Sequence, residues 1–340
     1  MSKIICFGEI MGRFNPPGYG RFVQSEIFEL SYGGGEANVA VSLALFGHNA
    51  SYVTKLPKNE LGQSAVNSLR RYGVDTSYIV RGGERIGLYF LEKGVSQRPS
   101  KVIYDRKHSA IADAAPNDFN WKEIFSGADW FHFTGITPAL SDDCAEICLE
   151  ACKEAKSRNV TISCDINYRK NLWSRDKAKE VMSRLMEYAD ICIGNEEDAA
   201  DVFGIAAEDS DVAGGKINHE KYIDVARRLH KQFSLKKVAV TLRSSISASD
   251  NKWAAMLFDG ENAVFSAEYL IHIADRVGGG DAFGAGLIHS LLTGESDKEA
   301  VEFATAASCL KHSIEHDFNL STLDEVKNLL ASGGSGRIQR

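Results

Sequence analysis

The most chemically informative stretch of this sequence joins consecutive glycines to an acid. Gly278, Gly279 and Gly280 directly precede Asp281, and the small and apolar residues that follow predict a helix. Glycines permit backbone conformations in which successive N–H groups converge on an anion, and a helix that begins there adds the positive end of its dipole. The stretch therefore predicts a phosphate cradle, with Asp281 placed to accept a proton from an attacking alcohol.

The same residues also have a purely structural interpretation, in which the glycines make a tight turn and Asp281 caps the helix. A short glycine run is a weak motif by itself, so both interpretations stand at this point. The run is not a Walker A loop, because no Gly-Lys-Ser or Gly-Lys-Thr follows it.

A second glycine run, Gly33–Gly35, lies near the other end of the chain and is followed by Asn38 and Ala40. Small residues allow backbone and ligand hydroxyls to approach closely, and the amide of Asn38 can both donate and accept hydrogen bonds. The alternative interpretation is a glycine-rich turn that leads into an alanine-rich core helix.

Together the two segments resemble the signatures of PfkB, or ribokinase-like, carbohydrate kinases. Gly33–Ala40 is similar to the family's Gly-Gly-x-x-x-Asn-x-Ala, and Asp275–Asp281 to its Asp-Thr-Thr-Gly-Ala-Gly-Asp, with Arg276 and Val277 in place of the threonines. The two occur in the family's order, and the resemblance extends from Ile4 to about Leu330. It implies that Asp281 is the base, that the three glycines form an anion hole, and that Asp275 holds a substrate hydroxyl.

The resemblance also implies ATP and Mg²⁺ as cofactors, and it leaves open whether a monovalent cation is required. Asp198 stands in the family's Asn-x-x-Glu motif and is expected to hold Mg²⁺ through water, although an acidic helix start is an equally natural interpretation. The family's Lys-x-Gly-x-x-Gly is absent after Leu242, where Arg243 and serines stand instead. The residues expected to bind ATP are Asn167, Asn195, Thr241, Arg243, Ser244, Gly278, Gly280 and Ala307.

Two further stretches resemble the 2-keto-3-deoxygluconate kinases of this family. Asp165–Trp173 is similar to their Asp-x-Asn-x-Arg-x-x-Leu-Trp, and Lys311–Asn319 to their Lys-His-(Ser/Thr)-x-x-Gly-Asp-Phe-Asn, with His316 in place of glycine. An arginine suits a substrate carboxylate, because its planar head donates two parallel hydrogen bonds. The residues expected to contact the substrate are Gly34, Asn38, Tyr89, Tyr104, Arg106, Arg169, Asp275 and Asp317.

This resemblance implies phosphorylation of 2-dehydro-3-deoxy-D-gluconate by ATP at its terminal hydroxyl, to give the 6-phosphate in sugar-acid catabolism. It does not distinguish the galactonate epimer from the gluconate. The alternatives are a kinase of a neutral sugar such as fructose and, in another class, a non-catalytic sugar-binding regulator on the same fold.

Alternating strand-like and helix-like segments must position these residues. Strands are predicted at Lys3–Phe7, Ala50–Lys55, Trp130–Thr134, Thr161–Asp165, Ile191–Gly194 and Lys237–Leu242, and helices at Glu36–Phe46, Gly62–Tyr72, Asp142–Ser157, Asp176–Met186 and His219–Gln232. This order predicts an α/β fold with a mostly parallel sheet and helices on both faces, the ribokinase-like fold.

Two segments lack helices and cannot easily join such a sheet. A turn at Asn15–Gly18 precedes an extended Arg21–Ser31, and Ile86–Glu92 with Lys101–Arg106 predicts a β-hairpin. We expect a small β-sheet lid from about 11–32 and 85–106 on one kinase domain over 1–330, with surface decoration as the alternative. The Gly/Ser-rich 331–340 is expected to be a flexible tail, and the lid edges predict a homo-oligomer.

Bulk composition excludes several other classes of protein. The 340 residues carry a net charge of −7 without a basic cluster, so we expect a sugar acid and ATP as partners rather than nucleic acid or a membrane. No secretory leader is evident, and the seven cysteines lie mostly in apolar segments, which predicts reduced thiols in the cytoplasm. Cys144, Cys148 and Cys152 recur along one helical face, where packing is favoured over a metal site.

Overall fold

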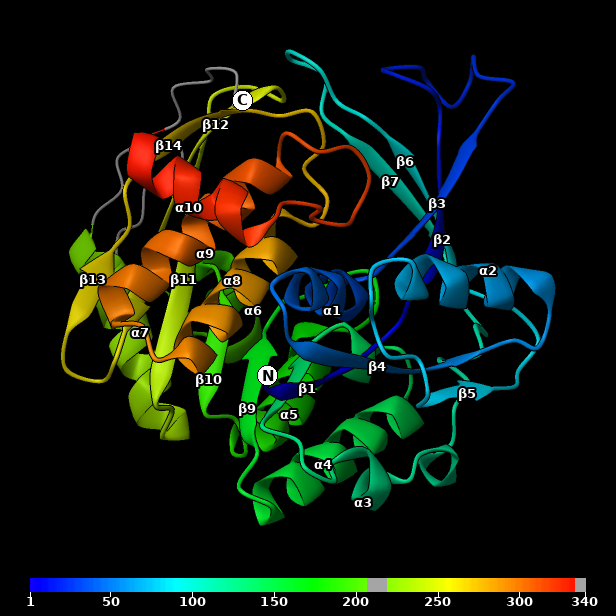
Figure 1. The fold of residues 1–340 in the computed structure, drawn as a ribbon, viewed down its shortest axis with the longest axis horizontal. Coiled ribbons are helices and arrows are strands. Elements are labelled where there is room, and N and C mark those ends of the chain that lie inside the picture. The colour runs from blue at the N-terminus through cyan, green and yellow to red at the C-terminus, as the bar shows by residue number, and fades with distance from the viewer. Residues whose placement is uncertain (207–218, 334–340) are drawn as a thin grey trace.

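The computed structural model describes residues 1–206 and 219–333, and in these ranges ten strands form one central sheet (Figure 1). From β5 to β11 all neighbouring strands run parallel, whereas β12, β13 and β14 extend the edge as an antiparallel unit. The strands are β1 (Lys3–Phe7), β4 (Asn49–Leu56), β5 (Ile79–Arg81), β8 (Trp130–Thr134), β9 (Thr161–Asp165), β10 (Ile191–Gly194), β11 (Lys237–Ser245), β12 (Asp250–Phe258), β13 (Ala263–Phe265) and β14 (Tyr269–His272).

Helices cover both faces of this sheet, because alternate side chains of each buried strand point to opposite sides. On β1, Ile5 and Phe7 join the hydrophobic cluster of one face, whereas Ile4 and Cys6 join that of the other. The first face packs against α3 (Trp121–Ile124), α4 (Asp142–Ser157), α5 (Arg175–Met186), α6 (Glu196–Phe203) and α7 (His219–Phe233). The second packs against α1 (Gly35–Leu45), α2 (Glu60–Arg70), α8 (Gly279–Thr293), α9 (Asp297–Lys311) and α10 (Leu323–Ser332).

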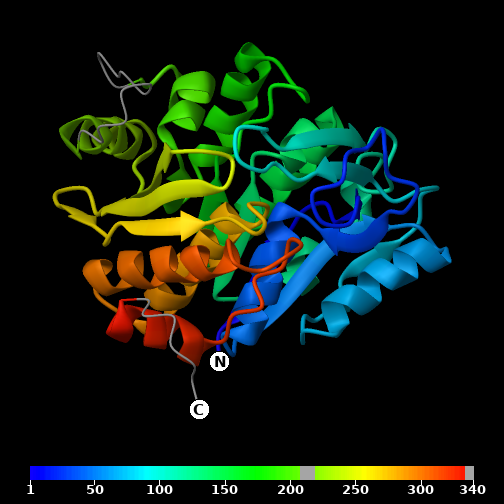
Figure 2. The ribbon, with the colours of Figure 1, turned by 90° about the horizontal axis from the view of Figure 1, so that it is seen from above.

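A separate four-stranded sheet stands beside the main body, as Figure 2 shows from above. Its order is β3-β2-β6-β7, from β2 (Met11–Asn15), β3 (Glu29–Gly33), β6 (Leu88–Glu92) and β7 (Lys101–Asp105). The β6–β7 hairpin places Tyr89 directly opposite Tyr104. The expected extended run Arg21–Ser31 is wrong over most of its length, because Gln24 and Ser25 turn back to donate to the carbonyl of Arg21 and the strand begins at Glu29.

The predicted mostly parallel α/β architecture is confirmed, while the antiparallel extension β12–β14 was not predicted. Cys144, Cys148 and Cys152 are buried along α4, and no group of three or more metal-ligating side chains occurs in the described ranges. Of the expected tail 331–340, residues 334–340 lie outside the described residues. In the same ranges, no helix is both long and apolar enough to cross a membrane.

Candidate active site

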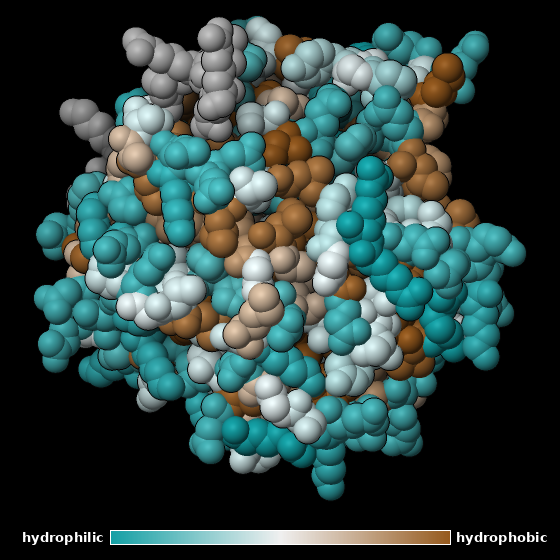
Figure 3. Space-filling model, viewed as in Figure 1, coloured by the Kyte–Doolittle hydropathy of each residue, from teal (hydrophilic) through white to brown (hydrophobic). Residues whose placement is uncertain are grey.

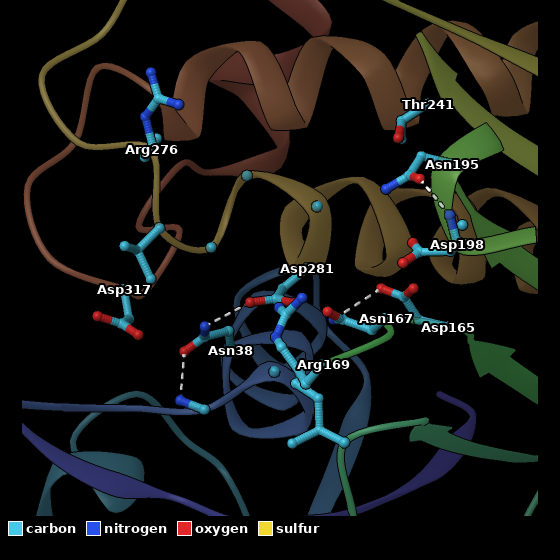
Figure 4. Close-up of a pocket in the computed structure, with 18 of the residues that line it drawn as sticks. Asn38, Asp165, Asn167, Arg169, Asn195, Asp198, Thr241, Arg276, Asp281 and Asp317 are labelled. Atoms are coloured by element: carbon cyan, nitrogen blue, oxygen red, sulfur yellow. Dashed lines mark hydrogen bonds between the residues drawn. The ribbon is translucent and has the colours of Figure 1, made fainter. Parts of the chain in front are cut away.

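A cavity of about 630 Å³ opens at the carboxyl ends of the parallel strands, where ligands bind in open α/β sheets (Figure 4). It is bounded by the ends of β9, β10 and β11, by the start of α8 and by the small sheet. The predicted site residues that line it are Gly34, Asn38, Tyr89, Tyr104, Arg106, Asn167, Arg169, Asn195, Asp198, Thr241, Arg243, Ser244, Gly278, Gly279, Gly280, Asp281 and Asp317.

Two predicted residues lie elsewhere. Asp275 is buried behind the cavity wall and accepts hydrogen bonds from Arg13 and from the backbone N–H groups of Val277 and His316. Ala307 is buried within α9 and is not among the lining residues. The structure therefore does not bring either of them to the cavity surface.

The two glycine segments meet at Asp281, which lies in the first turn of α8. The side chain of Asn38, on α1, donates a 2.6 Å hydrogen bond to the Asp281 carboxylate and accepts one from the backbone of Gly34 (Figure 4). Burial raises the pKa of Asp281 to about 7, and the charges of Asp317 and Glu36 act in the same direction, whereas Asn38 lowers it. A carboxylate with a pKa near neutrality is suited to accept a proton at physiological pH.

Gly278 and Gly280 serve different purposes at the entrance of α8. Gly278 has a φ of 85°, and a Cβ there would lie 2.1 Å from the carbonyl oxygen of Asp317, so only glycine fits. A Cβ on Gly280 would meet no atom within 4 Å, because this residue opens onto the cavity. Behind them, Ser308 donates a 2.7 Å hydrogen bond to the carbonyl of Gly279 and braces the loop against α9.

Acidic side chains gather along the wall formed by β9 and α6. Asn195 caps α6 by accepting from the backbone of Asp198, and Asp198 accepts from the backbone of Tyr168 at 3.0 Å. Burial raises the pKa of Asp198 to about 6, and burial together with Asp198 and Asp281 raises that of Asp165. Carboxylates whose charged forms are disfavoured in this way fit a hydrated divalent cation, which would offset their repulsion.

Tyr89 and Asp317 form the wall beside the small sheet. The Tyr89 hydroxyl donates to the Asp317 carboxylate at 2.6 Å, and Arg13 of β2 donates to the same carboxylate at 2.9 Å. Arg13 also pairs with Asp275, so its fully buried guanidinium connects the small sheet to the segment before α8. Charge neutralisation inside this buried network replaces the solvation that each group loses.

The two arginines near this wall differ in their partners. Arg106 is buried and paired with Glu9, to which its Nε donates at 2.7 Å. Arg169 follows β9 and donates to the carbonyl of Tyr168 at 3.2 Å. Among the side chains that the structure describes, no carboxylate lies within 4 Å of the Arg169 guanidinium, although its charge lowers the pKa of Asp281 and of Asp198. Its head can therefore still bind an anion.

Comparison with known proteins identifies the family. Residues 1–313 match the pfkB family carbohydrate kinases. The chain belongs to this family. The predicted carbohydrate kinase activity and ribokinase-like fold are thereby confirmed.

Relatives of this carbohydrate kinase have related names. It is 30% identical over 335 residues to 2-dehydro-3-deoxygalactonokinase of Haloferax volcanii, with 98% of each chain covered. It is 28% identical over 332 residues to 2-dehydro-3-deoxygluconokinase of Bacillus subtilis, with 96% of this chain and 95% of that one covered. A crystal structure of 2-dehydro-3-deoxygluconokinase from Thermotoga maritima has a TM-score of 0.94 and 48% identity, covering 98% of this chain and all of that one.

Sequence reasoning missed several residues at the carbohydrate kinase site. Arg13 and Glu36 are fully buried, and Glu36 accepts hydrogen bonds from Thr134 and Thr137 at 2.8 Å each. Trp253 and Arg276 line the cavity. The available signal was a charged residue inside an apolar segment, since buried charges require partners from elsewhere in the fold.

Proposed function

We propose that this carbohydrate kinase transfers the γ-phosphate of ATP to the terminal hydroxyl of 2-dehydro-3-deoxy-D-gluconate. The observation that carries the proposal is the Asp281 carboxylate, held by Asn38 at the glycine-lined entrance of α8 in the cavity that also contains Arg169. The names of the Bacillus and Thermotoga relatives support the choice of sugar acid. The product, a 6-phosphate, would enter sugar-acid catabolism, and ATP dependence assigns the reaction to the cytoplasm.

In the proposed reaction, Asp281 accepts the hydroxyl proton while the hydroxyl oxygen forms a bond to the γ-phosphorus. The bond between that phosphorus and the bridging oxygen breaks, and ADP leaves with the electron pair. The backbone N–H groups at Gly278–Gly280 and the dipole of α8 stabilise the negative charge on the transferring group. Mg²⁺ would be held by Asn195 and Asp198 through water, and when bound it supplies further charge neutralisation to the phosphates.

Arg169 is assigned to the substrate carboxylate, because it alone of the two cavity arginines near Tyr89 lacks a carboxylate partner in the described chain. Tyr89, Tyr104 and Asp317 would bind the hydroxyls. The small sheet, from about 11–32 and 85–106, would act as a lid that excludes water, which could otherwise accept the phosphoryl group.

A substrate panel tests the proposal. ADP release is measured with 2-dehydro-3-deoxygluconate, its galactonate epimer and fructose, and the gluconate should have the highest kcat/KM. Fructose as the preferred acceptor would reject the acid-sugar proposal, and sugar binding without any ATP consumption would favour the non-catalytic regulator. The galactonate epimer is the nearest competitor, because the Haloferax relative is named for it.

The role of Asp281 has its own test. Asp281→Asn should lower kcat by a factor of about 10²–10⁴, the usual effect of losing a general base, while sugar and nucleotide still bind. Asp176→Asn is the matched control, since this exposed acid lies in the first turn of α5, remote from the cavity lining. Full activity in Asp281→Asn would refute the assignment.

We also propose that the kinase assembles through its small sheet. Apolar side chains are exposed on its β2–β3 connection, with Val23 at 89% and Ile27 at 69%, and on β7, with Ile103 at 46%. Figure 3 shows a mostly hydrophilic face on which brown groups recur at the upper right, near the connection between β2 and β3. Exposed apolar strands with free edges favour association with another copy.

A further inference from the structure

Arg243, Trp253 and Arg276 meet at one end of the cavity. Arg243 on β11 lies directly opposite Trp253 on β12, and paired residues of antiparallel strands project from the same face. Arg276 precedes Gly278 in the segment that leads into α8. All three side chains line the same cavity as Asp281.

Among the side chains that the structure describes, no carboxylate lies within 4 Å of the guanidinium of Arg243 or Arg276. Arg169 is also without such a partner, whereas Arg106 is paired with the buried Glu9. Arg276 donates one hydrogen bond, to the carbonyl of Ala248 at 3.1 Å. Burial lowers the pKa of Arg276 and the charge of Arg243 lowers it further, so the two guanidinium groups repel each other.

Trp253 adds a donor without an acceptor. Its side chain is only 6% exposed, and its indole N–H has no hydrogen-bond partner although it is buried. The ring packs against His312 with a centroid separation of 5.1 Å. Since an indole N–H can only donate, an acceptor atom in the cavity would satisfy it.

The backbone at this position cannot serve as a glycine-rich phosphate loop. β11 continues to Ser245 and stays paired with β12, so that Ser244 faces Lys252 and Ser245 faces Asn251. The amide groups that pair with β12 are engaged in the ladder, while β10 on the other side reaches only Val240. Positive charge toward a phosphate at this wall comes from side chains.

We propose that Arg243 and Arg276 form a clamp for the diphosphate of the nucleotide, with the Trp253 indole donating to one of its oxygens. That the ligand of this clamp is a nucleotide rests on the proposed function. A diphosphate between the two heads removes their repulsion and receives paired donors from each. The same contacts stabilise the charge that accumulates on the leaving ADP. Arg169 remains for the acid acceptor.

Binding of ADP and adenosine to Arg243→Gln, Arg276→Gln and the double variant tests the clamp by calorimetry. Each single variant should bind ADP about ten- to a hundredfold more weakly, because a charge-assisted contact is lost, while adenosine binding stays unchanged. In steady-state assays the KM for ATP should rise and that for the sugar acid should not. Trp253→Phe keeps the ring against His312 and should weaken ADP binding about two- to tenfold.

Lys252→Gln is the matched control, because it removes a charge from the same strand next to Trp253, where Lys252 is paired with Glu268 at 2.9 Å. Its ADP affinity should equal that of the native chain. Arg276→Lys keeps the charge and separates a folding defect from a lost contact, since it should recover part of the ADP affinity.

ADP affinity unchanged in the double variant would overturn the clamp, as would a raised KM for the sugar acid alone. Because ADP binding needs no acceptor, arginine-dependent ADP binding supports the clamp even if no acid is phosphorylated. That outcome would reject only the proposed acceptor, 2-dehydro-3-deoxygluconate, and not the clamp.

Discussion

At the scale of single residues, the site depends on buried carboxylates with very different partners. Asp281 faces the cavity with one donor, Asn38, whereas Asp317 receives hydrogen bonds from both Arg13 and Tyr89. Burial raises the pKa of Asp281, which suits this carboxylate to accept a proton. Asp317 instead joins the small sheet to the segment that follows α9, through its bonds with Arg13 and Tyr89.

The pKa of Asp281 predicts an acid limb in the pH profile of kcat/KM. Only the deprotonated carboxylate can accept a proton, so activity should rise with pH up to about 7 and then level off. The hydrogen bond from Asn38 lowers this pKa, and Asn38→Ala should therefore move the limb to higher pH. The control is Asn67→Ala, on the exposed face of α2, which should leave the midpoint of the acid limb unchanged. An unchanged or lower midpoint in Asn38→Ala would contradict the assignment.

Arg13 is predicted to contribute strongly to stability. Arg13→Met would leave Asp275 and Asp317 buried without the guanidinium that is paired with both, and breaking a buried ion pair typically costs about 3–5 kcal/mol. Urea unfolding should report this loss, whereas exposed Arg71→Met should change the free energy of unfolding by less than about 0.5 kcal/mol. Equal stabilities for the two variants would show that the network is not a structural anchor.

At the scale of elements, the start of α8 combines a left-handed glycine turn with a backbone that opens onto the cavity. Gly278 adopts the left-handed conformation that caps the helix, and the next glycines present their backbone to the cavity. α1 approaches from the other side and brings Gly34 and Asn38. Two helix starts, distant in sequence, therefore converge on one space in which anions are favoured.

Two alanine substitutions should separate these features. Gly278→Ala should destabilise the protein by at least about 1–2 kcal/mol, because a Cβ is strained at this φ and would clash with Asp317. Gly280→Ala meets no atom and improves helix propensity, so thermal unfolding should show equal or higher stability. Its kcat should nevertheless fall, since the added methyl group crowds the proposed phosphoryl site, and unchanged kcat would refute an anion hole there.

At the scale of the whole molecule, the central sheet and the small sheet differ in how much of their apolar surface is buried. The central sheet is covered by helices on both faces, while the β2–β3 connection of the small sheet leaves apolar side chains such as Val23 and Phe28 exposed. The small sheet also supplies Tyr89 and Tyr104 to the cavity. Association through this sheet would therefore stabilise the element that we propose as a lid over the substrate.

Light scattering should test this association. The native chain should have the mass of an oligomer, and Val23→Lys with Ile27→Lys should reduce it toward the monomer, because two exposed apolar side chains become charged. Leu270→Lys is the control, since Leu270 is 73% exposed on β14, outside the small sheet. Identical masses for the native chain and the double variant would exclude this interface.

Local pattern by itself determined the parallel core strands except β5, the helices α1, α2, α4, α5, α7 and α8, and the β6–β7 hairpin, because hydrophobic periodicity and turn residues depend on near neighbours. The spacing of residues within the two family motifs likewise identified Gly33–Gly35 and Gly278–Gly280, and the position of Asp281 directly after the second of them. The antiparallel strands β12–β14 were missed. The extended run after Pro17 was misjudged, because local hydrogen bonds to Arg21 replaced strand pairing there.

Only the tertiary structure decided which charged groups face each other. The pairs of Arg13 with Asp275 and of Arg106 with Glu9 join residues 262 and 97 positions apart, and no local pattern encodes such partners. They decide which arginines remain free to bind an anion and why Asp275 lies behind the cavity. The physical reason is that burial makes a charge depend on its spatial neighbours, which are set by the packing of the whole chain.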